Sequence, residues 1–188
     1  IVVFDLGQKK ILHTFTAPIA KEKSLKHCGG CKDQGVRSLA LSPDETLLYA
    51  TSFEANALSV INVATGEIIQ SITTGAHPDS LILSRDGTEA WVMNRTSNSV
   101  SAIDLVTYQH VADIPLEKYD GTGTSGKPGA WVMALSPDEK TLLIPGMVRG
   151  DIVRINTITH QKEDFPTGDA RGVVSAMGFR PKNGEIIF

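Results

Sequence analysis

The sequence is poor in cysteine, in aromatic residues and in net charge. Its 188 residues include two cysteines and 6% aromatic residues, and the formal net charge at pH 7 is −3. Without a second cysteine pair the signal for a structural zinc site is weak, and without a basic run there is no electrostatic footprint for nucleic acid. No apolar run approaches the roughly 18 residues of a membrane-spanning helix. We therefore expect no nucleic-acid partner and no membrane span in this segment.

The sequence also lacks any sustained helical periodicity, and short alternating runs stand in its place. The segment 36–75 is the clearest example, with Ser-Pro-Asp-Glu at 42–45 as a type I turn signal and Thr65-Gly66 as a hairpin turn signal. Its four predicted strands span residues 37–42, 47–52, 58–63 and 67–72. Short strands separated by turn chemistry predict an antiparallel meander.

One phrase occurs three times, and a fourth segment echoes it. Leu-Ser-Pro-Asp stands at 41–44 and 135–138, Leu-Ser-Arg-Asp at 83–86, and Phe-Arg-Pro-Lys at 179–182. The steps between equivalent residues are 42, 52 and 44 residues. A period of roughly 40–45 residues made of short strands is typical of a propeller blade. The sequence predicts an all-β propeller of four-stranded antiparallel blades, with about four blades' worth in this chain.

The repeat divides the chain into blades and two inserts. The predicted units are a partial blade at 1–18, an insert loop at 19–35, blades at 36–75 and 76–116, an insert loop at 117–127, a blade at 128–168 and the start of another at 169–188. Closed propellers have about 4–8 blades. We expect this chain to be part of one propeller domain, with seven blades when complete, which would need about 300 residues.

The stretch LLYATSFEANALSVINVATGEIIQSITTG at 47–75 resembles the YVTN-type propeller repeat. The residues where that repeat has its usual Asp are Asp5, Asn62, Asp104 and Asn156. Thr65-Gly66 matches the turn of the repeat, whereas 106–108 and 157–159 depart from it. The resemblance covers nearly the whole chain. It implies a periplasmic or extracellular propeller of the superfamily that includes quinoprotein amine dehydrogenase subunits, cytochrome d1 and hydrazine-synthase-like propellers.

The length variation falls between blades, after the fourth strand of each meander. Connections in a meander alternate between the two ends of the sheet, so the inserts 19–35 and 117–127 are expected on one face, near the mouth of the central channel. Loops on a rigid scaffold are where function usually lies. This face is therefore the predicted binding face.

Both cysteines lie in the first insert, in His27-Cys28-Gly29-Gly30-Cys31-Lys32. A disulfide across the glycine pair is favoured, and suits an oxidising compartment. The alternatives are a metal site that combines the thiolates with His27 or His77, covalent haem attachment with Lys32 where the usual motif has His, and a redox dithiol. No cofactor is predicted, and a haem or a metal stays the alternative.

Charged and polar residues lead into the innermost strand of each blade. The predicted channel-mouth residues are Arg37, His77, Asp79, Lys127, Asp169 and Arg171. Such a mixed ring suits a small anion or an acidic loop of a partner protein. For His77, a structural role in the turn Gly75-Ala76-His77-Pro78 is favoured, and the resemblance to haem d1 propellers offers an axial ligand as the alternative.

The remaining motifs point to a structural role, or to a function only in a particular type of organism. Asn94-Arg95-Thr96 has the form of an N-glycosylation sequon on an exposed loop, usable only in a secreted eukaryotic protein. Trp91 is expected to pack between blades. No order of Ser, His and Asp, or of Cys and His, supports a nucleophilic triad, so catalytic residues stay unassigned.

The favoured function is a non-catalytic binding or scaffold subunit, periplasmic or extracellular, that docks a partner protein through the face with the two inserts. The partner could be a subunit of a redox enzyme. One alternative is an oxidoreductase or a haem- or metal-carrying propeller in nitrogen-compound or amine metabolism. The other alternative is a cell-surface adhesion protein. Propellers host many unrelated activities, so the fold alone does not choose among them.

The state of Cys28 and Cys31 is directly measurable. We expect the intact mass of the native protein to rise by two hydrogens on reduction, because the favoured disulfide opens, and we expect no visible absorption band. A mass increment of a haem or a metal ion, with a matching band, would contradict this prediction and move the chemistry to the segment from His27 to Lys32.

Overall fold

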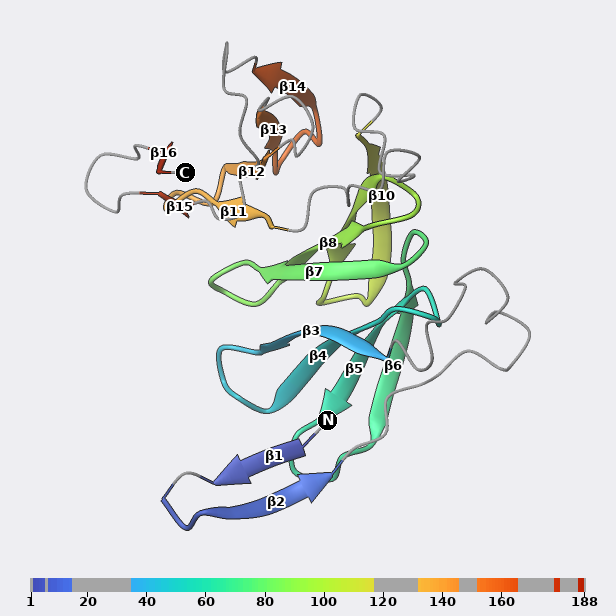
Figure 1. The fold of residues 1–188 in the computed structure, drawn as a ribbon, viewed down its shortest axis with the longest axis vertical. Coiled ribbons are helices and arrows are strands. Elements are labelled where there is room, and N and C mark those ends of the chain that lie inside the picture. Colours follow the sequence, from blue (N-terminus) through green and yellow to red (C-terminus); the bar gives the residue numbers. More distant parts are fainter. Residues whose placement is uncertain are drawn as a thin grey trace, which may run out of the picture.

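The computed structural model describes residues 2–5, 7–14, 35–116, 132–145, 152–165, 178–179 and 186–187. Within these ranges all regular structure is β-strand, and no helix occurs, so none is long and apolar enough to cross a membrane. The strands form three sheets of four strands and two sheets of two, each in chain order (Figure 1). The predicted all-β propeller is confirmed, with about three to four blades in this chain.

The three complete sheets repeat one plan, in which every neighbouring pair of strands is antiparallel. The first contains β3 (Val36–Leu41), β4 (Leu47–Ser52), β5 (Ala57–Asn62) and β6 (Ile68–Thr73). The second contains β7 (Pro78–Leu83), β8 (Glu89–Asn94), β9 (Ser99–Asp104) and β10 (Gln109–Pro115). The third contains β11 (Ala134–Leu135), β12 (Thr141–Pro145), β13 (Ile152–Asn156) and β14 (Lys162–Phe165).

Two shorter pairs flank these sheets. They are β1 (Val2–Asp5) with β2 (Lys10–Thr14), and β15 (Gly178–Phe179) with β16 (Ile186–Ile187). The sheets follow one another along the molecule, and the first strands β3 and β7 of two successive sheets lie side by side (Figure 1). Successive blades therefore stack face to face.

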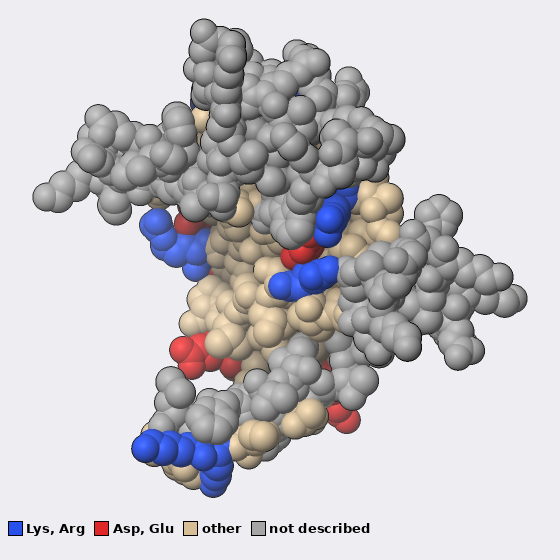
Figure 2. Space-filling view, viewed as in Figure 1, with Lys and Arg blue, Asp and Glu red and all other residues tan. Residues whose placement is uncertain are grey.

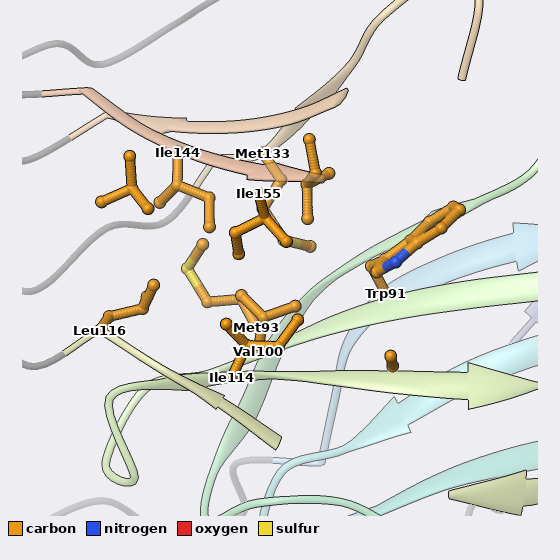
Figure 3. Packing of buried hydrophobic residues seen from close by; sticks show 11 residues of the cluster. Trp91, Met93, Val100, Ile114, Leu116, Met133, Ile144 and Ile155 are labelled. Atoms are coloured by element: carbon orange, nitrogen blue, oxygen red, sulfur yellow. The ribbon is translucent and has the colours of Figure 1, made fainter. Parts of the chain in front are cut away.

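Alternate residues of each middle strand fill the spaces on the two sides of its sheet. In β8, Ala90 and Val92 pack toward β3–β6, together with Tyr49 and Val60. Trp91 and Met93 pack toward β11–β14, where the cluster includes Met133, Ile144 and Ile155 (Figure 3). A fully buried aliphatic or aromatic side chain contributes about 1.5–3 kcal/mol. The middle strands are thus buried on both faces, and Trp91 packs between blades as predicted.

The phrase repeated in the sequence forms the turn between the first and second strand of each blade. Ser42 donates its hydroxyl hydrogen to Asp44 Oδ1 at 2.5 Å and accepts from the Leu47 N–H at 2.9 Å. Asp44 Oδ1 also accepts from the Thr46 N–H at 3.2 Å. The equivalent Ser–Asp bonds measure 2.7 Å in the second blade and 2.6 Å in the third. The phrase therefore recurs because two side chains satisfy the backbone donors of one tight turn.

A second repeated turn joins the third and fourth strands. Asn62 Oδ1 accepts the N–H groups of Ala64 and Thr65 at 2.9 and 3.0 Å, and Asp104 and Asn156 hold their own turns in the same way. The left-handed position of this turn is Gly66 in the first complete blade. Lys9, Tyr108 and His160 occupy it elsewhere, with φ between 53° and 57°. The blades that lack the Thr-Gly pair therefore keep the left-handed backbone conformation of this turn with a residue other than glycine.

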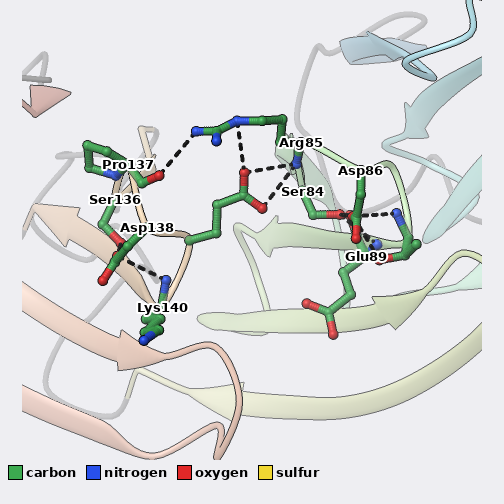
Figure 4. A network of polar contacts seen from close by, with 10 residues as sticks. Ser84, Arg85, Asp86, Glu89, Ser136, Pro137, Asp138 and Lys140 are labelled. Carbon is green, nitrogen blue, oxygen red and sulfur yellow. Dashed lines mark hydrogen bonds and ion pairs between the residues drawn. The ribbon is translucent and has the colours of Figure 1, made fainter.

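The first turns of successive blades also contact one another. A Cβ added to Gly87, which has φ +72°, would lie 2.5 Å from Cδ of Pro43. At the next interface Arg85 replaces that proline and Glu139 replaces that glycine. Arg85 Nε lies 3.4 Å from Glu139 Oε1, and Arg85 Nη2 donates to the carbonyl of Pro137 at 3.1 Å (Figure 4). An apolar contact at one blade interface is therefore a polar one at the next.

The turn carboxylates predict how stability depends on pH. The Ser42 hydroxyl is the main cause that lowers the pKa of Asp44, and Ser84 and Ser136 do the same for Asp86 and Asp138. A carboxyl group whose pKa is lower in the folded than in the unfolded chain stabilises the fold above the unfolded value, about 3.9. That contribution is lost as the pH falls through the lower folded pKa.

We expect the free energy of unfolding in urea to drop as the pH falls below about 4. The triple variant Asp44→Asn, Asp86→Asn, Asp138→Asn should show a flatter dependence on pH in this window. Asp79→Asn is the control, because this residue lies outside the three turns. Equal slopes in the wild type and the triple variant would show that the serine–aspartate turns do not carry the effect.

Candidate functional site

Three side chains from two neighbouring blades stack at the end of the sheets where β4 and β6 end. Arg37 belongs to β3, Phe53 follows β4, and His77 precedes β7. The Arg37 Cζ atom lies 4.9 Å from the Phe53 ring centroid. The rings of Phe53 and His77 are 4.4 Å apart at 6° between their planes. Phe53 is 4% exposed and Arg37 is exposed, so a buried aromatic plate carries a cation at the surface.

Hydrogen bonds hold His77 from both blades. Its backbone N–H donates to Asn56 Oδ1 of the preceding blade at 2.8 Å. Its ring Nδ1 lies 2.6 Å from Thr96 Oγ1 of its own blade. His77 has φ +57°, a conformation that costs a non-glycine residue about 1–2 kcal/mol. The stacked ring and these bonds fix the residue where the backbone alone would disfavour it.

A buried polar network supports the loop that carries His77. Gly75 donates its N–H to Ser101 Oγ at 3.2 Å, and the N–H of Ala76 donates to Ser97 Oγ. Asn94 Nδ2 donates to Ser101 Oγ at 2.8 Å. Asn94 is 1% exposed at the end of β8, so the expectation that its sequon lies on an exposed loop is wrong. The amide packs against Gly75 and serves the fold, and no folded chain could present it for glycosylation.

The structure places three of the predicted channel-mouth residues. Arg37 and Asp79 are the second residues of β3 and β7, and so occupy equivalent positions. Arg37 and His77 meet through Phe53. Within the described ranges the Asp79 carboxylate makes no hydrogen bond or ion pair, and its backbone carbonyl accepts from Thr51 Oγ1 at 3.5 Å. The other predicted site residues, His27, Cys28, Cys31, Lys32, Lys127, Asp169 and Arg171, lie outside the described residues.

Sequence reasoning missed Phe53, Asn56 and Thr96. Asn56 had a detectable signal, because Asn98 stands at the same place just before the third strand of the next blade. Both have φ near +50°, and Asn98 Nδ2 donates to the carbonyl of Leu116 at 2.7 Å. Phe53 and Thr96 carry no repeat signal, because each contacts His77, which has no equivalent in the other blades.

A serine, an aspartate and a histidine also meet on the second blade. Ser101 Oγ donates to Asp113 Oδ1 at 2.6 Å, and His110 Nε2 lies 3.2 Å from the same oxygen. The carboxylate therefore separates the hydroxyl from the imidazole, and Ser101 is fully buried. A nucleophilic triad needs the imidazole against the hydroxyl. In the part of the chain that the structure describes, no three His, Cys, Asp or Glu side chains are grouped to hold a metal ion.

Comparison with known proteins supports the fold. No protein-family model and no curated protein matches the sequence. Among solved structures, the chain is similar to the hydrazine synthase of Kuenenia stuttgartiensis, with a TM-score of 0.66 and 21% sequence identity. The match covers 82% of this chain and 42% of that one, so this chain spans less than half of its length. The likeness shows a propeller-like fold, and the YVTN-type resemblance stays a prediction.

The backbone of Gly75 lies so close to Asn94 that a larger residue at position 75 should destabilise the protein. A Cβ at this position would lie 2.6 Å from Asn94 Nδ2 and 2.8 Å from Ser97 Oγ. We expect Gly75→Ala to lower the free energy of unfolding by about 1–3 kcal/mol, because the buried amide must move. Gly35→Ala is the matched control, since no atom lies within 4 Å of its added Cβ. Equal unfolding midpoints in urea for the two variants would contradict this account.

Proposed function

We propose that this protein is a non-catalytic binding or scaffold propeller, periplasmic or extracellular, that docks a partner protein through the face bearing Arg37. The observation that carries the proposal is the stack of Arg37, Phe53 and His77. It joins two blades and presents a cation from a buried aromatic support. The compartment follows from the family resemblance and from the favoured disulfide at Cys28 and Cys31.

The stack prepares Arg37 for recognition before a partner arrives. An arginine that is already held on an aromatic ring loses less side-chain freedom when it binds a carboxylate. Its planar guanidinium can donate two parallel hydrogen bonds to one carboxylate. An acidic loop of a partner protein is therefore the chemistry that this position favours.

The surface charge also favours a protein partner. Among the described residues of the face shown in Figure 2, a few acidic and basic side chains lie around a central uncharged area. Such a pattern suits the mixed contacts of a protein interface more than a uniform polyanion. The connections after the second and fourth strands share the face with the stack, and the sequence assigns the inserts 19–35 and 117–127 to this same end.

A second candidate is a propeller of an oxidoreductase complex that carries a haem or a metal. The likeness to a solved hydrazine synthase favours it. The residues that would hold such a group are His27, Cys28, Cys31 and Lys32. A visible absorption band that shifts on addition of dithionite would favour this candidate over the scaffold. A colourless protein with reducible Cys28 and Cys31 would favour the scaffold.

The proposed docking face is tested by reversing one charge at each of the two ends of the sheets and measuring partner binding. Arg37→Glu should reduce chemical cross-linking to a partner in extract of the source organism by roughly tenfold or more. Lys140→Glu is the matched control, because this exposed lysine lies in a turn at the opposite end. A partner that is retained by the first variant and lost by the second would place docking on the other face and refute the proposal.

A further inference from the structure

A pocket of about 230 Å³ lies between the second and third complete sheets. Its apolar lining consists of the buried Trp91 and Ala102 and the exposed Val111, and Glu89, Asp104 and His160 line it as well. Glu89 and Asp104 are paired residues at the turn ends of β8 and β9, and His160 comes from the turn before β14. The pocket thus lies at the end of the sheets opposite to the Arg37 stack.

The same corner is filled with apolar side chains between the first and second complete sheets. Strand register puts Leu47, Tyr49 and Val60 there at the positions of Glu89, Trp91 and Ala102. Tyr108 takes the position of His160 and packs against this apolar cluster. The pocket therefore lies where the second interface departs from the first. Ala102 stands in place of Val60, His160 in place of Tyr108 and Glu89 in place of Leu47.

In the described part of the chain the carboxylate of Glu89 forms no hydrogen bond or ion pair, and the group of opposite charge that acts on it is the ring of His160. The backbone N–H of Glu89 is held by Ser84 Oγ at 2.9 Å, and its side chain extends away from the turn network (Figure 4). Asp104 Oδ1 is occupied by the N–H groups of Val106 and Thr107. Arg85, in the same turn as Asp86, forms an ion pair with Glu139.

The surroundings of Glu89 disfavour the charged form of its carboxyl group. Burial is the main cause that raises the pKa of Glu89, and the charges of Asp86, Asp104 and Glu139 add to it, while His160 acts in the opposite direction. A partly desolvated carboxylate among other carboxylates is stabilised by a bound positive charge. An imidazole nitrogen that carries no proton can accept a hydrogen bond from the same cation.

We propose that this pocket binds a small organic cation, an ammonium group on a short alkyl chain. The nitrogen would lie between Glu89 and His160, and the alkyl chain would lie against Val111, above the buried Trp91 and Ala102. The volume is below the roughly 300–1,000 Å³ of pockets for drug-sized ligands, so a chain of a few carbons fits. The class of ligand follows from one carboxylate and one imidazole beside an apolar lining.

The test uses n-butylammonium titrated into the protein at pH 8 and followed by amide chemical shifts. We expect saturable shifts in residues of the pocket, and affinity reduced by about tenfold in Glu89→Gln, which removes the charge and keeps the shape. Glu67→Gln is the matched control, because this glutamate lies in a turn of the first complete blade, away from the pocket. Its affinity should equal that of the wild type.

A second variant tests the contribution of the apolar lining independently of the charge of Glu89. Ala102→Val restores the residue found at the equivalent Val60, and should abolish the shifts while it raises the thermal midpoint by filling the cavity. n-Butanol and butyrate, which lack the positive charge, should not bind. Equal binding of n-butanol and n-butylammonium, equal affinity in Glu89→Gln and wild type, or no saturable shift would overturn the proposal. If Ala102→Val does not fold, the Glu89→Gln and n-butanol comparisons still decide.

Discussion

Interdigitation of apolar side chains between successive sheets is the interaction on which the rest of this structure depends. β8 contributes Ala90 and Val92 to one interface and Trp91 and Met93 to the other, so the same strand belongs to two cores. Each blade buries its middle strands only because it has neighbours on both sides. The contacts between turns of successive blades, the Arg37 stack and the pocket all depend on how closely two such sheets approach.

The two ends of the sheets carry different chemistry because they close in different ways. At one end, serine, aspartate and asparagine side chains satisfy the backbone of short turns, so the backbone is uniform while the other turn residues differ between blades. At the other end, connections cross between blades, and buried groups such as Asn94 and Ser101 hold them. Residues there can meet partners from the next blade, as Phe53 meets His77.

The fold could be predicted because its signals are local and repeated. The Ser42–Asp44 pair and the Asn62 turn act within a few residues, so they recur in the sequence with the blade period. The contact of Phe53 with His77 could not be predicted in this way, since it depends on the rotation between two sheets. The cavity above Ala102 is likewise visible only after strand register shows which residue replaces Val60. Asn94 was misread because a sequon is a local pattern, whereas burial is not.

The two different turn contacts have a consequence for how blades of this chain could have been duplicated. Pro43 needs Gly87 opposite it, while Arg85 needs Glu139. A copied blade inserted elsewhere would set a proline against a glutamate, or an arginine against a glycine, and would lose one of the two contacts. At the two boundaries described, a change in one blade therefore has to be matched in its neighbour if the contact is to be kept. Gene-level shuffling of single blades would break this order, whereas duplication of two adjacent blades would preserve the contact between them.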